Sequence, residues 1–446
     1  MRHADTIAAI ATSPGRAGIG VVRLSGPATR NIEAAILGRP LNPRVATLCD
    51  FLDAKAAIMD RGIAIRYRAP HSYTGEDVLE LQGHGGPAVL QLVLRRCLEL
   101  GARPAQPGEF TQRAFLNDKL DLAQAESVAD LIDASSEAAA RGAMRSLAGE
   151  FSGRVGQLNQ TLIEVRSLIE ATLDFPEEEI DILERGGVSE KLDRLRQDVK
   201  ILLAEAEQGR ILRDGAKVVL IGQPNVGKSS LLNRLAQEEV AIVTEVPGTT
   251  RDPLRFELVI EGVPLHVVDT AGLRDATDVV EKIGIQRAWR EIEQADLALL
   301  IVDATTEIAD SDRLILAELP KRLKTLIIFN KIDLLKRAAS EITTRIGSEI
   351  WLSAKTGEGL ELLRGALLRS IGWTGTQEGS FIARERHLQA LRETQVSLNR
   401  AASEPGSLEL MAEELRLAQL ALGNITGQFS ADDLLGEIFS RFCIGK

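Results

Sequence analysis

The most constraining feature of the sequence is a glycine-containing loop that follows a short apolar run. Val218 to Ile221 form the run, and Gly222 to Ser229 then read GQPNVGKS, with the spacing GxxxxGKS. On a strand-to-helix turn this spacing forms a phosphate-binding loop, because the glycines let backbone amides curl around phosphate groups. Lys228 would reach the β- and γ-phosphates, and the Ser229 hydroxyl can ligate Mg²⁺. The loop predicts an α/β domain that binds a nucleoside triphosphate.

Three further segments follow in the order expected for such a domain. Asp269 opens the sequence DTAG after the apolar run Leu265 to Val268, so its carboxylate is placed at a strand end beside the metal. Asn330 to Asp333 read NKID after another predicted strand, and Ser353 to Lys355 read SAK after a third. Together these segments indicate that a nucleotide base, its phosphates and a metal ion meet at neighbouring strand ends.

The NKID segment predicts which base is bound. The carboxylate of Asp333 can accept two hydrogen bonds from N1 and N2 of guanine, whereas adenine has no such donor pair. A buried acceptor left unpaired costs roughly 1–3 kcal/mol, so GTP is preferred over ATP. Pro247 to Asp252 form a polar loop whose Thr250 hydroxyl can complete Mg²⁺ coordination. We interpret this loop as the first switch.

The residue that orients the attacking water is not fixed by the motifs. Ras-type GTPases carry a glutamine directly after the DxxG glycine, but this chain has Leu273 there. Glu281 is the nearest acidic candidate, with Asp275 and Asp278 as alternatives. From the residues alone, Glu281 could equally be a solvated helix residue.

Asn225 within the phosphate loop leaves a similar choice. Its amide oxygen could ligate a monovalent cation that neutralises charge as an arginine finger does, or it could only brace the loop. Arg251 competes for the charge-neutralising role, although it could instead form a surface salt bridge.

Composition limits the cellular context. With a net charge of −11, a uniformly basic surface for nucleic acid is excluded. Cys49, Cys97 and Cys443 are widely spaced, which favours a reducing cytosol without disulfides or a zinc site. No apolar stretch is long enough to span a bilayer, and no signal-peptide pattern is present. We therefore expect a soluble, cytoplasmic protein without membrane contact.

A chain of 446 residues predicts two to four domains. Residues 1–118 mix strand-like runs with one clear helix that starts at Pro87, so this domain is expected to be α+β. Residues 119–215 and 376–446 show helical periodicity, and 216–375 contain the nucleotide motifs. The economical interpretation is one helical domain in two parts with the α/β domain inserted between them; separate helical hairpins are the alternative.

Further segments extend the pattern over essentially the whole chain. They are PGR at 14–16, RLSG at 23–26, TGEDVLE at 74–80, GHGG at 83–86, PGEF at 107–110, NDKLDL at 117–122, DFPEE at 174–178 and FCIGK at 442–446. With the four nucleotide motifs, they closely resemble the MnmE (TrmE) family of bacterial tRNA-modification GTPases. A prenylation signal at Cys443 is excluded, because Lys446 is a poor terminal residue for it.

The resemblance implies a role in tRNA modification. Family members work with the FAD-containing partner MnmG to install an aminomethyl or carboxymethylaminomethyl group at C5 of the wobble uridine in certain tRNAs. A tetrahydrofolate derivative, 5-formyl or methylene, supplies the one-carbon unit. The family's folate contacts correspond to Arg23, Glu80, Lys119 and Lys446. Arginine and lysine suit the glutamate carboxylates of folate, while Glu80 could accept donors of the pterin ring.

The resemblance also implies roles in the nucleotide domain. Potassium is expected at Asn225, Thr244, Val246 and Thr249, magnesium at Ser229 and Thr250, and the water-orienting function at Glu281. Hydrolysis is expected to drive dimerisation cycles of this domain within a homodimer held by the N-terminal domains. Cys443 matches a family cysteine considered as a nucleophile, although packing or pocket lining is the simpler role. The expected GTP-contacting residues are Asn225, Val226, Gly227, Lys228, Ser229, Ser230, Thr244, Glu245, Val246, Pro247, Gly248, Thr249, Thr250, Asp269, Thr270, Ala271, Gly272, Asn330, Lys331, Asp333, Ser353, Ala354 and Lys355.

A function of another class stays open. The chain could be a regulatory GTPase switch that only recruits partners. Such a switch would have no use for Arg23, Glu80 and Lys119 around a pocket, and it should bind no folate.

Overall fold

The architecture comes from a computed structural model of the 446-residue chain. It describes residues 5–174, 187–238, 255–269, 289–306, 308–344, 347–375, 380–403, 407–428, 432–440 and 442–445. The chain forms two compact units. Unit 1 consists of 1–129, 146–198 and 393–446, and unit 2 consists of 130–145 and 199–392. Domain boundaries at 118, 215 and 375 stay a prediction.

Unit 1 contains a six-stranded sheet with the order β3-β4-β5-β2-β1-β6. All neighbours pair antiparallel except β1 and β6. Apolar side chains of α1 and α2 form one core with the strands. The elements are β1 (Thr6–Ile10), β2 (Ala17–Ser25), α1 (Thr29–Leu37), β3 (Thr47–Leu52), β4 (Ile58–Tyr67), β5 (Val78–Gly85), α2 (Pro87–Glu99), β6 (Ala102–Pro104) and α3 (Glu109–Leu116).

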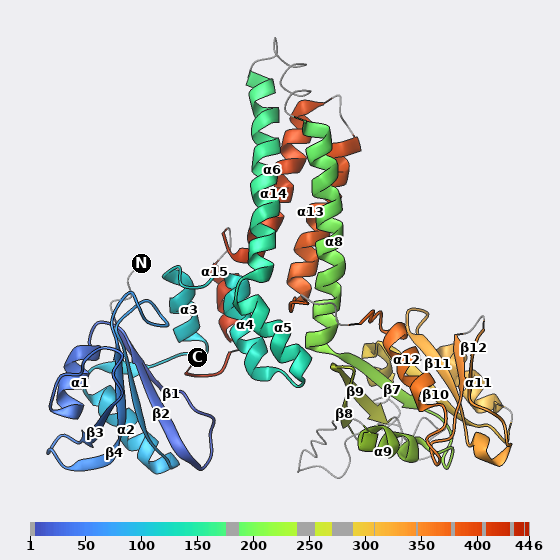
Figure 1. Ribbon diagram of the computed structural model, residues 1–446, viewed down its shortest axis with the longest axis horizontal. Coiled ribbons are helices and arrows are strands. Elements are labelled where there is room, and N and C mark those ends of the chain that lie inside the picture. Colours follow the sequence, from blue (N-terminus) through green and yellow to red (C-terminus); the bar gives the residue numbers. More distant parts are fainter. Residues whose placement is uncertain are drawn as a thin grey trace. The chain divides into compact units, whose positions relative to one another are not determined.

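The segments before β7 and after α12 are mainly helical (Figure 1). Within unit 1, α6 packs along α14, and Arg166 Nη1 donates a hydrogen bond to Gln419 Oε1 at 2.7 Å. The apolar residues of α15 form a cluster with Leu122 and Ala125 of α4. These helices are α4 (Leu122–Asp133), α5 (Glu137–Leu147), α6 (Glu150–Asp174), α8 (Val188–Asp214), α13 (Glu385–Ser403), α14 (Leu408–Thr426) and α15 (Asp432–Ser440).

The helical periodicity predicted from the sequence is confirmed where the structure describes it. Leu158, Leu162, Val165 and Ile169 are buried along α6. Of the predicted stripe Leu408, Met411, Leu415, Ala418 and Leu422 along α14, all are buried except the half-buried Leu408. None of the described helices has the length and apolar character needed to cross a membrane.

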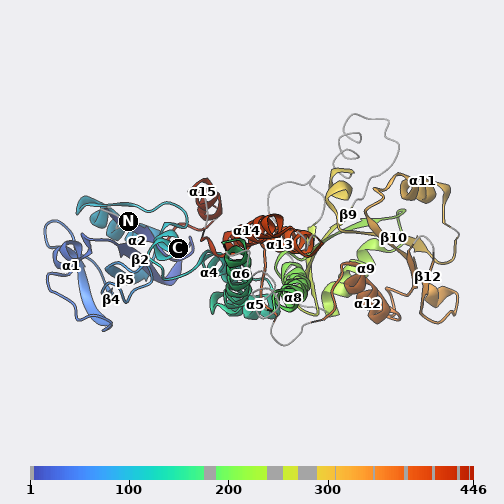
Figure 2. The ribbon, with the colours of Figure 1, turned by 90° about the horizontal axis from the view of Figure 1, so that it is seen from above.

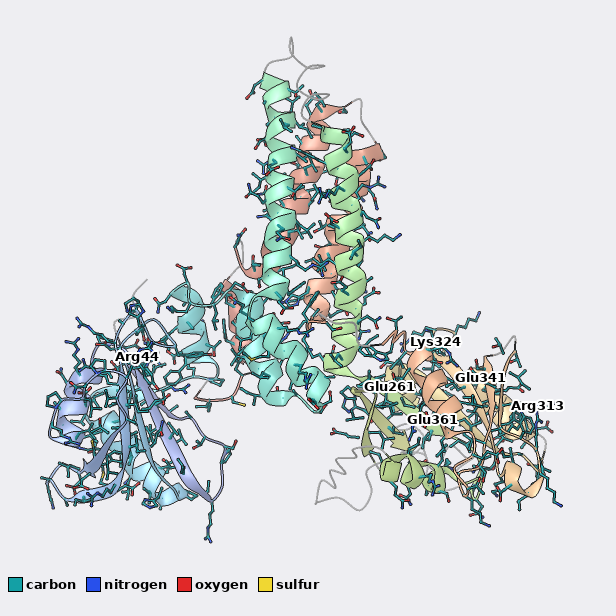
Figure 3. All side chains as sticks on the ribbon, viewed as in Figure 1. Arg44, Glu261, Arg313, Lys324, Glu341 and Glu361 are labelled. Carbon is teal, nitrogen blue, oxygen red and sulfur yellow. The ribbon has the colours of Figure 1, made fainter. Side chains whose placement is uncertain are left out.

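Unit 2 contains a seven-stranded sheet with the order β12-β13-β11-β10-β7-β9-β8. Apolar residues of α9 and α12 pack on one face, while those of α11 pack on the other (Figure 2). Charged side chains such as Glu261, Arg313 and Glu361 lie on its surface (Figure 3). The elements are β7 (Ala216–Ile221), α9 (Lys228–Glu238), β8 (Arg255–Ile260), β9 (Val263–Asp269), β10 (Leu297–Asp303), α11 (Asp310–Glu318), β11 (Lys324–Asn330), a 3₁₀ turn (Ile332–Leu334), β12 (Ser340–Thr343), β13 (Ser348–Trp351) and α12 (Leu360–Ser370).

The five inner strands of this sheet are mutually parallel. β9 pairs with β7, β7 with β10, β10 with β11, and β11 with β13, all in parallel register. Parallel strands end at the same edge of a sheet, and ligands of such folds bind outside those carboxyl ends. The predicted multidomain α/β and α+β fold class, with a P-loop domain, is confirmed.

Candidate guanine-nucleotide site and N-terminal pocket

The phosphate loop connects β7 to α9 through two glycines in conformations that other residues avoid. Gly222 has φ of 147°, and a Cβ there would lie 2.3 Å from the main-chain oxygen of Ile301. Gly227 has φ of 101°, and a Cβ there would lie 2.3 Å from Asn330 Nδ2. Both glycines are therefore required by backbone geometry and by close neighbours.

Lys228 is held against the loop that precedes it. Its Nζ donates hydrogen bonds to the main-chain oxygens of Gly222 at 2.7 Å and Gln223 at 3.2 Å. Ser229 and Ser230 follow on the exposed first turn of α9. Backbone amides at a helix start attract anions, so this end of α9 suits a phosphate group.

Asn330 at the end of β11 joins three segments of the site. Its Nδ2 donates to the main-chain oxygen of Val226 at 2.8 Å, inside the phosphate loop. Its Oδ1 accepts from the backbone N–H groups of Lys331 at 2.8 Å and Ala354 at 2.9 Å. One buried amide thus couples the phosphate loop, the NKID segment and the SAK segment.

Asp333, which is predicted to bind the base, is held in place by a neighbouring hydroxyl. Its Oδ1 accepts a hydrogen bond from the buried Ser353 hydroxyl at 2.7 Å. Lys331, at φ of 73°, forms an ion pair with Asp303 Oδ2 at 2.7 Å. The NKID segment is therefore held from both sides, and the second carboxylate oxygen of Asp333 has no hydrogen bond recorded among the described residues.

Asp269 ends β9 at the edge of the sheet that carries the phosphate loop. Burial raises the pKa of its carboxyl, and the charge of Lys228 only partly offsets this effect. Among the described residues, its Oδ1 is buried without a hydrogen-bond partner. An unpaired buried carboxylate oxygen beside a phosphate loop fits a magnesium ion or its water ligand.

Several residues predicted to act in this site lie outside the described residues. They are Thr244, Glu245, Val246, Pro247, Gly248, Thr249, Thr250, Arg251, Thr270, Ala271, Gly272, Asp275, Asp278 and Glu281. Of the four residues predicted to hold potassium, only Asn225 is described. It is exposed, with φ of 63° in the left-handed region that asparagine tolerates.

Arg23 and Glu80 form the centre of the predicted folate pocket. They face each other on the neighbouring strands β2 and β5, with Arg23 Nη2 2.9 Å from Glu80 Oε1. The Arg23 guanidinium lies 5.8 Å from the ring centroid of Tyr73 and 5.9 Å from that of Phe110. This arrangement offers a carboxylate acceptor fixed by a cation and bordered by aromatic rings.

The C-terminal segment reaches the same place. Arg23 Nη1 donates to the main-chain oxygen of Gly445 at 3.4 Å, and Ile444 forms an antiparallel bridge with Pro107. Cys443 is exposed, and its main-chain oxygen accepts from the N–H of Gly108 at 3.3 Å. Lys446 lies outside the described residues.

Lys119 is not brought into contact with Arg23 or Glu80 by any recorded interaction. Its aliphatic stem lies beside Gly75, where an added Cβ would be 3.4 Å from Lys119 Cγ. Sequence reasoning also missed Tyr73, Phe110 and Asp303, since single aromatic or acidic residues carry no spacing signal. Only the register of paired strands brings Asp303 beside Asn330.

The parallel sheet, the phosphate loop and the NKID and SAK segments define a P-loop guanine-nucleotide-binding protein. Comparison with known proteins identifies the family within this class. A family model described as the GTP-binding protein TrmE N-terminus matches residues 6–119, and one described as the MnmE helical domain matches 122–443. The chain belongs to the MnmE (TrmE) family.

Individual relatives cover the whole chain. The tRNA modification GTPase MnmE of Nitrosomonas europaea is 58% identical, with 100% of both chains covered. That of Thiobacillus denitrificans is 58% identical over 99% of this chain and 98% of its own. Among solved structures, the G domain of the T. maritima FeoB iron transporter covers 35% of this chain and 98% of its own at 26% identity, with a TM-score of 0.28, which is too low to inform the assignment.

Proposed function

We propose that the chain is a potassium-dependent GTPase that acts with MnmG in tRNA modification. The pair would install a carboxymethylaminomethyl or aminomethyl group at C5 of the wobble uridine, using a one-carbon unit from a tetrahydrofolate derivative. Membership of the MnmE family over the full chain supports this proposal. The observation that carries it is that one chain combines the fixed Asp333 carboxylate with the Arg23–Glu80 pair.

The nucleotide domain would bind GTP by contacts that the geometry supports. The Asp333 carboxylate would accept hydrogen bonds from guanine N1 and N2 while its Oδ1 keeps the hydrogen bond from Ser353. The Lys228 ammonium would leave the main-chain oxygens of the loop and bind the phosphates. Bound magnesium, held by Ser229 and Thr250 with Asp269 nearby, would supply charge neutralisation at the phosphates. FAD would enter only through MnmG.

Hydrolysis would depend on two further features. Glu281 would orient the attacking water, and Asn225 with Thr244, Val246 and Thr249 would hold potassium. A positive charge beside the phosphates can stand in for an arginine finger, which contributes roughly 10³–10⁵ in rate. Each hydrolysis cycle would then dimerise and separate the nucleotide domains of two chains.

The N-terminal pocket would bind the folate. Because Glu80 is already fixed by Arg23 and Gln82, its remaining acceptor capacity suits donors of the pterin ring. Lys119 and Lys446 would face the glutamate carboxylates of the folate. Cys443 stays a candidate for lining this pocket or for nucleophilic attack.

The proposed assembly is a cytoplasmic homodimer joined through N-terminal domains 1–118. It would form a heterotetramer or a larger complex with MnmG, and tRNA would bind mainly through MnmG. The inserted G domain at 216–375 would divide the helical domain into 119–215 and 376–446. No membrane contact is proposed.

The test is steady-state GTP hydrolysis by the purified chain with potassium or sodium as the only monovalent cation. We expect strong stimulation by potassium that Asn225→Ala removes. Glu281→Ala should bind GTP without hydrolysing it, while the exposed Glu318→Ala serves as a matched control with unchanged rates. Equal rates of GTP hydrolysis in potassium and sodium would contradict the cation-assisted mechanism. The positive charge beside the phosphates would then come from Arg251 or from a partner protein.

A regulatory switch without folate chemistry is the alternative function. Binding of 5-formyltetrahydrofolate to the purified chain separates the two functions. A chain that hydrolyses GTP but binds no folate would support the switch.

A further inference from the structure

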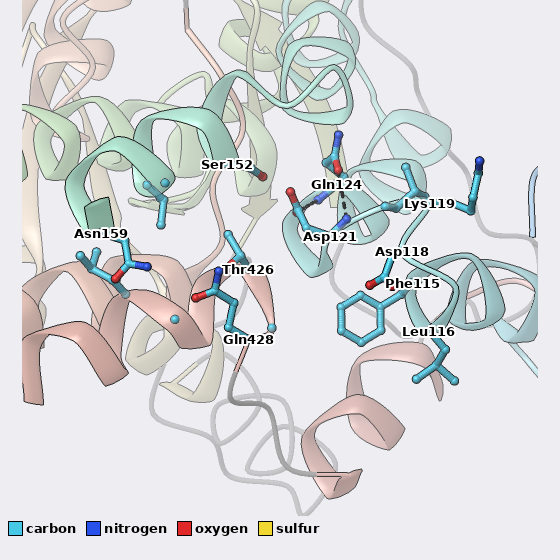
Figure 4. Close-up of a pocket in the computed structure, with 16 residues that line it drawn as sticks. Phe115, Leu116, Asp118, Lys119, Asp121, Gln124, Ser152, Asn159, Thr426 and Gln428 are labelled. Atoms are coloured by element: carbon cyan, nitrogen blue, oxygen red, sulfur yellow. Dashed lines mark hydrogen bonds between the residues drawn. The ribbon is translucent and has the colours of Figure 1, made fainter. Parts of the chain in front are cut away.

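Unit 1 contains a cavity of about 630 Å³ whose lining includes Lys119, a residue of the proposed folate site, together with residues to which the proposed function gives no role. It lies between the segment 115–124, the first half of α6 and the C-terminal end of α14. Figure 4 shows Phe115 and Asp118 on one side of the view and Asn159 of α6 on the other, with Asp121 and Ser152 drawn between them. A cavity of this volume is large enough for a small organic molecule.

Asp118 is fixed at the rim of the cavity by its backbone. Its φ is 54°, in the left-handed region, and its N–H donates to the main-chain oxygen of Phe115 at 3.0 Å. The residues on either side are also anchored, since Asn117 Nδ2 donates to the main-chain oxygen of Thr74 at 2.7 Å and the Lys119 N–H donates to that of Ala114 at 2.9 Å. The carboxylate of Asp118 has no recorded ion pair with any described residue.

Asp121 is fixed next to it by a reciprocal pair of hydrogen bonds. The Gln124 N–H donates to Asp121 Oδ1 at 2.9 Å, and the Asp121 N–H donates to Gln124 Oε1 at 3.0 Å. Gln124 Nε2 also donates to the main-chain oxygen of Leu147 at 3.0 Å, so the pair is braced from a second segment. Within the described chain, the other carboxylate oxygen of Asp121 has no recorded partner.

Helix α6 contributes Ser152, Gly156 and Asn159 to the lining from one face. Ser152 Oγ and Asn159 Oδ1 are buried, and neither has a hydrogen-bond partner among the described residues. Gly156 lies between them, and a Cβ added there would meet no atom within 4 Å. Buried polar atoms are almost always paired, so two orphaned atoms on one cavity wall indicate a missing hydrogen-bonding partner.

The lining favours a positively charged ligand. Two carboxylates without a recorded counter-ion line the cavity together with hydroxyl and amide groups, and the lining also includes the apolar Phe115 and the largely buried Val155 and Leu422. The side chain of Lys119 extends away from the other labelled residues in Figure 4, and it forms no recorded ion pair with either carboxylate. Ammonium groups form charge-assisted hydrogen bonds with carboxylates. An ammonium group and the methylene groups next to it can also pack on the face of an aromatic ring.

We propose that this cavity binds an aliphatic polyamine, with one ammonium group at Asp118 and Asp121 and another amine at Ser152 and Asn159. The methylene chain between the amines lies against Phe115, Val155 and Leu422. The ligand class follows from two features together: hydrogen-bond acceptors from two separate segments that line the cavity, and apolar residues in the same lining. This site is separate from GTP binding.

The experiment is isothermal titration of spermidine into the full-length, nucleotide-free chain. We expect one site per chain, with affinity weakened roughly tenfold by Asp118→Asn, which removes a charged hydrogen-bond partner. Asparagine tolerates the left-handed conformation, so this variant should keep the fold. Glu409→Gln, an exposed position on α14 away from the cavity lining, is the matched control and should bind like the wild type.

A second variant blocks the cavity without removing charge. Gly156→Leu places a side chain in the open space, and replacing a mid-helix glycine should leave the melting temperature unchanged or higher. We expect it to abolish the spermidine site. Binding that neither variant weakens would be diffuse attraction to an acidic surface, and it would overturn the proposal. Absence of spermidine binding at millimolar concentration would also overturn the proposal. So would titration heat from magnesium that these variants remove, if spermidine gives no titration heat.

Discussion

Asn330 donates a hydrogen bond from its side-chain Nδ2 to the main-chain oxygen of Val226 at 2.8 Å, and so ties the NKID segment to the phosphate loop. The same amide accepts from Lys331 and Ala354 through its oxygen. Because the Asn330 side chain is buried, these contacts are protected from competing water. Binding of the base and binding of the phosphates should therefore be energetically coupled through one residue.

Asn330→Ala should weaken GTP binding roughly 100-fold, because it removes three hydrogen bonds of about 1 kcal/mol each, two of them buried. The effect should appear for GDP as well, since the lost contacts do not involve the γ-phosphate. Fluorescent-nucleotide titration measures both affinities. Asn117→Ala, which removes a side-chain hydrogen bond to Thr74 in unit 1, is the control and should leave both affinities unchanged.

Asp333→Asn should shift the preference from GTP towards xanthosine triphosphate. An amide presents a donor where the carboxylate presented an acceptor, which suits the extra oxygen of xanthine rather than the guanine amine. Ser353 Oγ can still donate to the side-chain oxygen of the introduced asparagine, so the loop geometry should persist. A competition assay with both nucleotides measures the shift, and Asp310→Asn, exposed at the start of α11, should show none. An unchanged nucleotide preference would contradict the prediction that Asp333 binds the guanine base.

The positions of the nucleotide motifs at neighbouring strand ends were predictable because each motif follows a strand. Glycine spacing, strand ends and the order of the motifs are all local features of the sequence, and a parallel sheet brings such ends to one edge. Asp303 was not predictable, since its ion pair with Lys331 depends on β10 lying beside β11 in one particular register. Sheet order is a property of tertiary packing that no local pattern specifies.

In the N-terminal region, fewer of the structural elements could be predicted from the sequence. The helix at Pro87 was predicted, since proline starts it and an apolar stripe runs along it, but α1 was missed. No side chain caps the N-terminus of α1, and no acidic residue occupies its first turn, so the usual start signals are absent. The bridge between Pro107 and Ile444 joins segments that are far apart in the sequence, and the family resemblance predicted only that Lys446 lies near the Arg23 pocket.

Glu80→Gln should weaken binding of 5-formyltetrahydrofolate roughly tenfold or more while leaving GTP hydrolysis intact. The substitution removes the charge that both Arg23 and a pterin donor would use, and a hydrogen bond to a charged group contributes about 1.5–3 kcal/mol. Isothermal titration measures the folate affinity. Glu99→Gln removes a comparable carboxylate from an exposed pair with Arg96, and it should bind folate normally. Equal affinities for both variants would place the folate elsewhere.

Arg113 is fully buried in unit 1 and is surrounded by carboxylates. Its Nη2 lies 3.0 Å from Glu109 Oε1 and 2.9 Å from Asp5 Oδ1. Glu109 also accepts from Arg103 Nη1 at 2.8 Å and from the Gln106 N–H at 2.9 Å. Burial alone would raise the pKa of Glu109, but the hydrogen bonds from Arg103, Gln106 and Arg113 outweigh it and hold this pKa below the ordinary 4.5.

Glu109→Gln should therefore destabilise the chain by about 3 kcal/mol at pH 7, because it leaves buried arginine charge uncompensated. A carboxyl whose pKa is lowered in the folded state stabilises that state above its unfolded pKa, and this contribution is lost as the pH falls towards the folded pKa. The difference between wild type and variant should thus be constant from pH 7 to about pH 5 and shrink below pH 4.5. Urea denaturation followed by circular dichroism at a series of pH values measures it. Glu99→Gln, in an exposed pair, should follow the wild type at every pH, and a Glu109→Gln difference that did not change with pH would show that the lost contribution comes from packing rather than charge.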